Sequence, residues 1–352
     1  MTLSQVEIFK EEFNIIKKYV DHKEIISIIL YGGYGRNEGA EYIDEKGNRL
    51  LFNDIDLLLI VKNKISSTTI NKFKKKLLNE INITWIDFTQ YTISQLKRSN
   101  KSVFFYDLKY SSTILKGDKN ILSNIPNFSN KKIEYNEIKI LFTSRIWCFL
   151  GCFDEKGIGP LNGFKSAFFK NQISKAVFGI IDSILISENC YVTHYKEKKK
   201  LFLKDYASKY PLLKNYIDFA YENKFSPNGK PLNKNQTDKI YRDVSSQFLI
   251  IMSEILGKIY GKKISTGFDL VSLFKNDLRL NLKSILFKVL NNERKDELNI
   301  FICRIFTLYS LYDEKYNEYA LKYFNKINDK NTLKEYDFDF IRSNIVILKF
   351  NE

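Results

Sequence analysis

Two aspartates one residue apart are the strongest sign of chemistry in this sequence. Asp54 and Asp56 open the run Asp54–Val61, which is otherwise apolar. In a β-strand alternate side chains point to opposite faces, so both carboxylates face one side while Ile55 and Leu57 enter a core. Aspartate is depleted in strands, and two on one face need compensating charge, which Mg²⁺ ions bridging to phosphate oxygens would supply. The alternative is a strand that begins at Ile55, with Asp54 capping the preceding turn.

A glycine-rich turn stands before the two aspartates. Four of the 15 glycines in the 352 residues lie within eight positions: Gly32, Gly33, Gly35 and Gly39. Glycine permits positive φ and the close approach of a ligand to the backbone, whose successive N–H groups bind anionic oxygens. Arg36 adds a planar fork of donors that matches a phosphate. The turn therefore predicts a phosphate cradle; the simpler alternative is a tight surface turn with a solvated arginine.

A third acid is expected on the next strand. Asp87 lies in the β-branched and aromatic run Ile83–Thr89, at an alternating position one predicted helix beyond the aspartate pair. There it would complete a metal site and help to deprotonate an attacking group. Asp107 is the second candidate, ranked lower because it is expected to precede a strand over Ser111–Leu115. For Asp87 the alternative is a strand-end aspartate that faces solvent.

The order of these motifs is similar to that of a known enzyme superfamily. Gly-Gly followed by D-x-D and then a third acidic strand resembles the polymerase-β-type nucleotidyltransferases, and Gly32–Glu38 is similar to the turn of the PII signal-protein uridylyltransferases. The resemblance covers about residues 25–120. It implies a small mixed sheet flanked by helices. Such a domain binds a nucleoside triphosphate with Mg²⁺ and transfers a nucleotidyl group to an acceptor with loss of pyrophosphate.

The resemblance also implies a role for each residue of the site. The residues implied for nucleotide binding belong to the turn: Gly32, Gly33, Tyr34 and Arg36. The implied catalytic residues and metal ligands are the three acids: Asp54, Asp56 and Asp87. Two Mg²⁺ ions are implied, with Mn²⁺ as an alternative; one orients the triphosphate, and the second, which Asp87 also binds, activates the acceptor hydroxyl. The protein would thus bind ATP or another nucleoside triphosphate, and the sequence does not choose among ATP, CTP, GTP and UTP.

One feature departs from the family pattern. Twenty residues, 34–53, separate Gly33 from Asp54, which is more than is usual in the family. The surplus, Glu41–Leu51, contains turn-forming residues at its centre and predicts a hairpin between two short strands. An inserted hairpin leaves both ends of the site in place and would shape the entrance for the second substrate.

Hydrophobic periodicity predicts the elements that position these residues. Leu3–Val20 predicts an amphipathic helix, Ile25–Tyr31 a strand that leads into the glycine turn, and Thr68–Asn82 a helix between the two acidic strands. Beyond a linker over Asn120–Asn130 the apolar residues recur at helical spacing. Three such stripes are Ile173, Val177, Ile180 and Ile184; Tyr241, Val244, Phe248, Ile251 and Ile255; and Phe301, Ile305, Leu308 and Tyr312.

We therefore predict an α+β protein with two domains. A small mixed-sheet nucleotidyltransferase domain would occupy residues 1–125, and an all-helical substrate-binding domain would occupy residues 131–352. The acceptor would lie in the cleft between them, a common place for small ligands. Candidate contacts are polar or aromatic residues of the first helices: Arg145, Lys165, Lys170, Lys175, Tyr191 and Tyr195. Lys175 and Tyr195 are the predicted acceptor-binding pair, with a snorkelling or surface side chain as the alternative.

The net charge of +15 bears on the choice of acceptor. A basic surface attracts nucleic acid, but the lysines here are spread along the chain. The clusters Lys74–Lys76 and Lys198–Lys200 are expected on solvated helix surfaces. A small-molecule acceptor is therefore favoured over a tRNA or protein acceptor. A non-catalytic nucleotide-binding module ranks third, because it would be expected to lack a carboxylate of the D-x-D.

Cysteine usage and hydropathy predict the compartment. The four cysteines fit no zinc-binding spacing with the two histidines, and Cys148 and Cys152 are expected as buried thiols one helical turn apart. No apolar run reaches the length of a membrane span, and the first residues lack a signal-peptide pattern. We therefore predict a cytoplasmic protein without a membrane partner.

Overall fold

The computed structural model describes residues 4–44, 46–52, 54–152, 157, 159–275, 297–327 and 333–347. The chain divides into two compact units, and each of them draws on two stretches of sequence. Unit 1 comprises Met1–Glu137 and Glu188–Gly229, and unit 2 comprises Ile138–Ser187 and Lys230–Glu352. The functional domains expected over 1–125 and 131–352 stay a prediction.

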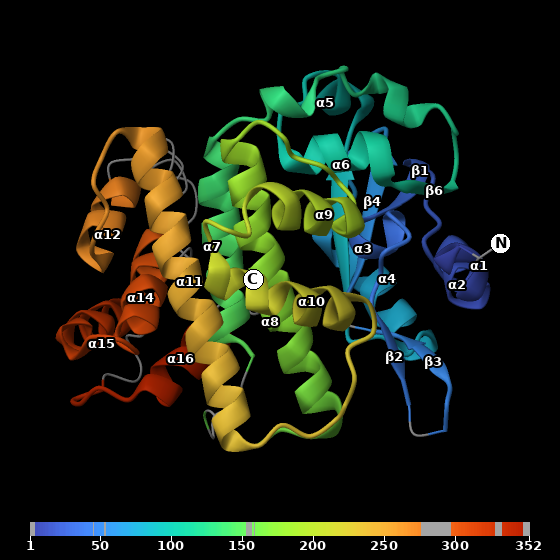
Figure 1. The fold of residues 1–352 in the computed structure, drawn as a ribbon. Helices are drawn as coiled ribbons and strands as arrows, with labels where there is room; N and C mark the ends of the chain where they lie inside the picture. Colours follow the sequence, from blue (N-terminus) through green and yellow to red (C-terminus); the bar gives the residue numbers. More distant parts are fainter. Residues whose placement is uncertain are drawn as a thin grey trace. The chain divides into compact units, whose positions relative to one another are not determined.

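Unit 1 is built on a four-stranded mixed sheet with the strand order β5-β4-β1-β6 (Figure 1). Its strands are β1 (Ile25–Tyr31), β4 (Asp54–Val61), β5 (Trp85–Tyr91) and β6 (Thr113–Lys116). β4 runs parallel to β5 and antiparallel to β1, which also pairs antiparallel with β6. The small mixed sheet that the sequence predicts is confirmed.

One face of this sheet carries the main core of unit 1. The alternate residues of β4 that were expected to point inward are buried at 0–1% exposure: Ile55, Leu57, Leu59 and Val61. They belong to one apolar cluster with side chains from α1 (Gln5–Ile8), α2 (Lys10–Tyr19) and α4 (Ser67–Glu80), and with Phe9, which joins α1 to α2. Each fully buried aliphatic side chain contributes about 1.5–3 kcal/mol. The core therefore holds the opposite, acid-bearing face of β4 in a fixed place.

The remaining elements of unit 1 are the glycine turn, a hairpin, and further helices and turns. The glycine turn forms α3 (Gly32–Gly35), and the predicted hairpin is confirmed as β2 (Glu41–Ile43) paired with β3 (Arg49–Leu51). The other elements, in chain order, are α5 (Ile93–Lys97), α6 (Val103–Ser111), the 3₁₀ turns η1 (Ile121–Asn124) and η2 (Asn130–Lys132), α9 (Tyr195–Asp205) and α10 (Pro211–Phe225). The expected linker over Asn120–Asn130 thus contains regular turns.

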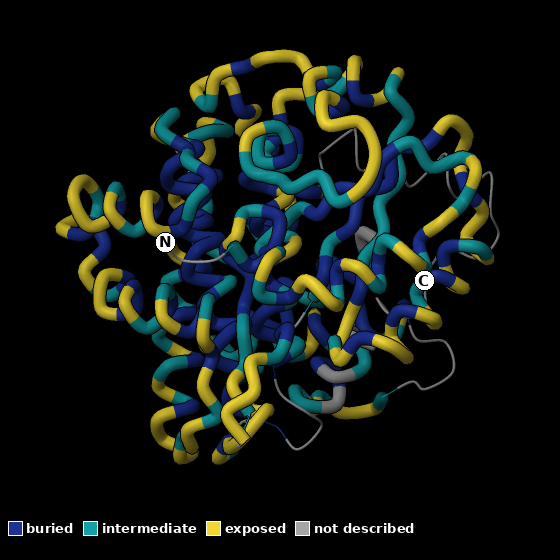
Figure 2. Tube along the Cα trace, turned by 90° about the vertical axis from the view of Figure 1, so that its right-hand side faces the viewer, coloured by how far each residue is buried: buried dark blue, intermediate teal, exposed yellow. Residues whose placement is uncertain are grey.

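Unit 2 is helical, as the sequence predicts for the C-terminal part. Its helices are α7 (Asn136–Leu150), α8 (Gly163–Ser187), α11 (Lys234–Tyr260), α12 (Gly267–Lys275), α14 (Glu297–Tyr309), η3 (Glu314–Tyr316), α15 (Asn317–Ile327) and α16 (Phe338–Ile347). Figure 2 shows buried and exposed stretches along the chain trace. α8 is buried over most of its length. All members of the first two predicted stripes are buried. In the third, Tyr312 was wrongly predicted, because α14 ends at Tyr309 and Tyr312 is 42% exposed.

Two further expectations concern cysteines and membranes. Cys148 and Cys152 are both buried and reduced, as predicted. Among the helices that the structure describes, none has the length and apolar character needed to cross a membrane.

Candidate active site

The glycine turn lies directly against the aspartate pair. β1 ends at Tyr31, and the chain enters α3 through Gly32, whose φ is +65°. A Cβ placed on Gly32 would lie 2.0 Å from Asp56 Oδ2, so only glycine leaves space for this carboxylate. The structure thus brings together two motifs that the sequence separates by a hairpin.

Strand register places the three predicted acids on one face of the sheet. Asp56 pairs with Tyr31 of β1 on one side and with Asp87 of β5 on the other, and Asp54 pairs with Trp85. β4 begins at Asp54, so the alternative of a strand that starts at Ile55 is wrong. All three acids are partly exposed. We call Asp54, Asp56 and Asp87 the carboxylate edge.

Asp87 is already engaged by two neighbours. The indole Nε1 of Trp85 donates to its Oδ1 at 2.7 Å, and Lys74 Nζ lies 3.9 Å from the same oxygen. Lys74 also lies 5.2 Å from the centroid of the Trp85 ring. The side chain of Asp87 remains 47% exposed. One of its oxygens is therefore fixed in orientation while the carboxylate stays accessible to solvent.

The pKa of the partly buried Tyr31 hydroxyl is affected by the negative charge of the carboxylate edge. Burial raises the pKa of Tyr31, and the carboxylates of Asp56, Asp87 and Asp54 raise it further, although its hydrogen bond with Thr89 acts in the opposite direction. The two hydroxyl oxygens of that bond are 3.2 Å apart. The pKa of the Tyr31 hydroxyl thus lies above its ordinary value, mainly through burial, and the carboxylates add to the shift in the direction expected for nearby negative charge.

The donor chemistry of the carboxylate edge fits a hard divalent cation. Carboxylate oxygens are ligands that Mg²⁺ prefers, and neighbouring strands stand about 5 Å apart, within reach of one ion. The absent side chain of Gly32 lets the Asp56 carboxylate lie against the backbone of the turn. In their present side-chain positions, however, no three Asp, Glu, His or Cys residues of the described ranges converge on one point. Holding an ion would require these carboxylates to rotate toward one another.

Tyr34 occupies a structural position. It is 2% exposed, and its hydroxyl accepts from Phe52 N at 2.8 Å and donates to the carbonyl of Ala40. These bonds tie the glycine turn to both ends of the β2–β3 hairpin. The predicted contact between the Tyr34 hydroxyl and a triphosphate therefore has no support in this geometry, because the hydroxyl proton is given to a carbonyl.

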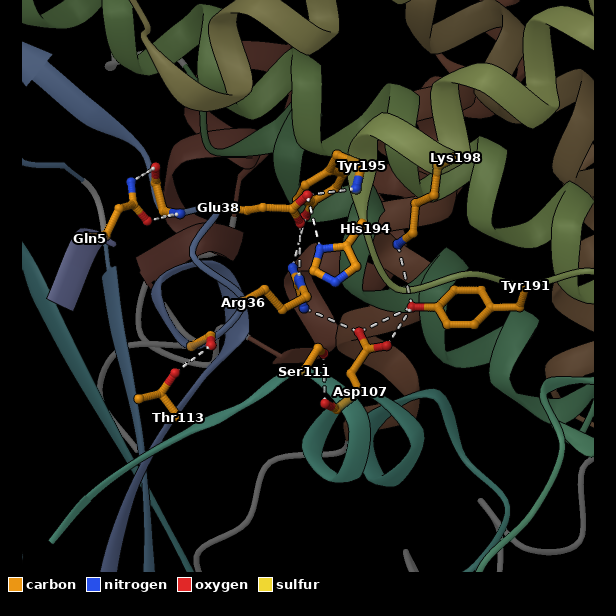
Figure 3. A network of polar contacts seen from close by, with 12 residues as sticks. Gln5, Arg36, Glu38, Asp107, Ser111, Thr113, Tyr191, His194, Tyr195 and Lys198 are labelled. Carbon is orange, nitrogen blue, oxygen red and sulfur yellow. Dashed lines mark hydrogen bonds and ion pairs between the residues drawn. The ribbon is translucent and has the colours of Figure 1, made fainter. Parts of the chain in front are cut away.

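Arg36 is enclosed by protein groups (Figure 3). Its Nη1 donates to Asp107 Oδ2 at 3.1 Å, its Nε lies 3.4 Å from Glu38 Oε2, and its Nη2 donates to the Tyr195 hydroxyl at 3.4 Å. The side chains of Arg36 and Glu38 are each 10% exposed. Burial lowers the pKa of Arg36, but Tyr195, Asp107, Tyr191 and Glu38 together raise it above its ordinary value. The guanidinium is charged and directed inward.

The segment before and within α9 completes this cluster. Tyr191 donates its hydroxyl hydrogen to Asp107, with both carboxylate oxygens at 3.1 Å, and accepts from Lys198 Nζ at 3.3 Å. Glu38 Oε1 accepts from the backbone N–H of Tyr195 at 3.0 Å. Lys198 is 2% exposed, so its prediction as a solvated surface lysine is wrong. We call the cluster the Arg36 network; its members are Arg36, Glu38, Asp107, Tyr191, Tyr195 and Lys198.

The two residues predicted to bind the acceptor belong to different units. Tyr195 is 8% exposed and lies in the Arg36 network, with its ring 5.3 Å from Arg36 Cζ. Lys175 lies half-buried in α8 of unit 2. Asp107, the second candidate for the third acid, lies within α6, which leads into β6 (Thr113–Lys116), so its expected place before a strand is confirmed. It binds Arg36, and the hydrogen-bond partners of both residues lie too far away in sequence for a local pattern to reveal.

Comparison with protein-family models finds no match for this chain, and comparison with curated proteins finds none either.

Proposed function

We propose that this chain is a metal-dependent nucleotidyltransferase. It would move a nucleoside monophosphate from a nucleoside triphosphate to an acceptor hydroxyl and release pyrophosphate. The observation that carries this proposal is the joint placement of Gly32, Asp56 and Asp87. Two carboxylates are register partners on neighbouring strands, and a left-handed glycine lies against one of them. A carboxylate edge next to a side-chain-free turn is suited to a cation and a polyphosphate together.

Each residue of the carboxylate edge has a distinct role in this proposal. Asp54 and Asp56 would hold a divalent cation, and Asp87 would bind on the side of the acceptor. When bound, such a cation neutralises charge on the triphosphate and lowers the pKa of a coordinated hydroxyl. Asp87 would take the acceptor proton on Oδ2, since Trp85 orients the carboxylate through Oδ1. Gly32 and Gly33 would face the triphosphate with backbone alone.

We propose a small molecule as the acceptor, with a tRNA or protein acceptor as the second candidate. The spread of lysines along the chain supports the first choice. The acceptor's hydroxyl must reach the solvent-accessible carboxylate of Asp87, which is open to ligands of either size. Turnover with small polyols and aminoglycosides, but not with tRNA or protein, is the expected result. The reverse preference would select the second candidate.

The test is pyrophosphate release from each of the four nucleoside triphosphates with Mg²⁺ and a panel of acceptors. Asp56→Asn is expected to lower turnover by on the order of a thousandfold, because several kcal/mol of charge stabilisation are lost. Asp21→Asn is the matched control, since the Asp21 side chain is 75% exposed and pairs with Lys116 at the surface. Nucleotide binding that needs no metal and leads to no pyrophosphate would refute the proposal.

A further inference from the structure

The Arg36 network differs from an ordinary surface ion pair because its members come from three distant parts of unit 1. Arg36 and Glu38 follow the glycine turn, Asp107 belongs to α6, and Tyr191 precedes α9 by a few residues. Arg36 is separated from Asp107 by 71 positions and from Tyr195 by 159. Arginine pairs well with carboxylates, but it keeps such partners only where the fold holds them in place.

The network is linked to the position of the glycine turn through the backbone. Arg36 is the last residue of the turn, and its N–H donates to Gly32 O at 3.3 Å. The carbonyl of Gly35, next to Arg36, accepts from Thr113 Oγ1 at 2.9 Å, which attaches this end of the turn to β6. A Cβ on Gly35 would lie 2.3 Å from Leu30 O, so the turn packs closely on β1. The side chain of Arg36 adds a further attachment of the turn, through Asp107.

Within the network, Tyr191 determines where Asp107 presents its carboxylate. The Tyr191 hydroxyl lies 3.1 Å from both oxygens of Asp107, and Tyr191 is 1% exposed. Its backbone carbonyl accepts from Asn130 Nδ2 at 2.7 Å, which fixes the tyrosine independently of the acid. Asp107 in turn accepts a hydrogen bond from Arg36 Nη1. The buried Tyr191 hydroxyl therefore fixes the orientation of the Asp107 carboxylate, and this carboxylate fixes the position of the Arg36 guanidinium.

We propose that Arg36, Asp107 and Tyr191 form a positioning relay: Tyr191 orients Asp107, Asp107 holds Arg36, and Arg36 keeps the glycine turn in the position that binds a nucleotide. In this proposal Arg36 does not itself bind the triphosphate. The relay makes Tyr191, which lies outside residues 25–120, necessary for nucleotide affinity. This inference rests on the proposed nucleotidyltransferase function. It replaces the direct phosphate contact that the sequence pattern predicts for Arg36 with an indirect one, through Gly32 and Gly33.

The first test is Tyr191→Phe in the full chain, assayed by pyrophosphate release. The KM for the nucleoside triphosphate is expected to rise about fivefold, the effect of one buried hydrogen bond, while kcat stays within about twofold. A displaced turn weakens ground state and transition state equally, which raises KM alone. Tyr206→Phe is the matched control, since the Tyr206 hydroxyl, at the end of α9, contacts Cys190 Sγ at 3.4 Å and not Asp107. It is expected to leave KM unchanged.

The second test separates a relay from a direct phosphate contact. Arg36→Lys keeps the charge but loses the fork that spans Asp107 and Tyr195. If the relay is correct, Arg36→Lys and Tyr191→Phe both raise KM, and the double variant is no worse than the more severe single one. If Arg36 binds phosphate directly, Tyr191→Phe leaves KM unchanged and Arg36→Lys alone raises it. That outcome would overturn the relay.

A third measurement stays valid if the proposed function fails. Urea unfolding of the wild type, the two single variants and the double variant needs no nucleotide. The relay predicts that the effects of Arg36→Lys and Tyr191→Phe on the unfolding equilibrium are non-additive. Additive effects would reject the coupling whatever the enzyme does. Non-additive unfolding in a protein that releases no pyrophosphate would instead reject the nucleotidyltransferase proposal and leave the coupling intact.

Discussion

The carboxylate edge and the Arg36 network both contact the glycine turn, but they differ in the charges that they contain. The carboxylate edge groups like charges, and its Asp87 side chain is 47% exposed. The Arg36 network groups opposite charges, and its Arg36 and Glu38 side chains are 10% exposed. A few residues of chain, from Gly32 to Glu38, connect a group of three carboxylates, one of which has Lys74 at 3.9 Å, to a buried group in which positive and negative charges face each other.

This difference indicates that the carboxylate edge binds a ligand, whereas the Arg36 network supports the structure of the turn. Like charges held together near solvent are unfavourable until a cation arrives, so such a group is retained for what it binds. A buried group of mixed charge is costly to desolvate, and it holds a geometry only when its hydrogen bonds are made. Charge sign and exposure, taken together, therefore indicate which side of the turn meets a ligand. Three pairs of substitutions test this division.

The largest expected difference is between the two acids Asp107 and Asp87. Asp107→Ala would leave the buried Arg36 guanidinium and the Tyr191 hydroxyl without their acceptor, and should lower the free energy of unfolding by about 3 kcal/mol. Asp87→Ala removes an exposed carboxylate and should change that free energy by less than about 0.5 kcal/mol while turnover is lost. Urea unfolding followed by circular dichroism measures both. If both variants lowered the free energy of unfolding equally, the distinction between a ligand-binding carboxylate edge and a structural Arg36 network would be wrong.

A smaller effect is expected from Gly32→Ala, compared with Gly47→Ala. Both glycines have positive φ, at +65° and +83°, so alanine at either position should cost about 1 kcal/mol of stability. At Gly47 the new Cβ meets nothing within 4 Å, whereas at Gly32 it meets Asp56 Oδ2 at 2.0 Å. Turnover should therefore fall about a hundredfold for Gly32→Ala and stay unchanged for Gly47→Ala. If Gly32→Ala turns over normally, contact with Asp56 has no part in the reaction.

The smallest effect is expected for Tyr34→Phe. The change removes the hydroxyl that joins Ala40 to Phe52 and should cost about 1 kcal/mol of stability. The KM for the nucleoside triphosphate should not change, because the ring still packs on Phe9 and Phe13 and keeps the turn in place. Tyr110→Phe is the control, since Tyr110 is 50% exposed. A clear rise in KM for Tyr34→Phe would restore the nucleotide-binding role that the sequence predicts for this residue.

Local patterns were sufficient to predict the sheet and the acids on it. The alternation of Asp54 and Asp56 with apolar residues determined which face is buried, because one face had to enter the core. The predicted strand Ile25–Tyr31 coincides with β1, and the turn-forming residues within Glu41–Leu51 gave the hairpin. These features depend on neighbours within a few positions, which a single sequence displays directly.

Features that depend on distant partners were not predictable. The pattern around Arg36 shows a donor fork but not Asp107 or Tyr195, which the fold brings to it. Lys198 stands in a run of lysines typical of a solvated helix, yet it is buried beside Tyr191. Asp107 was expected to precede a strand, and it does precede β6, but the expectation did not include the helix α6 that begins at the Ser102 cap and contains it.

The discontinuity of unit 1 has a consequence for its synthesis. Because Glu188–Gly229 belongs to the same unit as the sheet, Tyr191 and Tyr195 of the Arg36 network leave the ribosome long after the glycine turn does, whereas Glu38 and Asp107 are made before them. The sheet must persist without Tyr191 and Tyr195 while α7 and most of α8 are being made. Pairing across such distances is slow relative to local structure. A nascent chain that stops before residue 188 should therefore lack the contacts that Tyr191 and Tyr195 make in the Arg36 network, and only translation past Gly229 allows unit 1 to close.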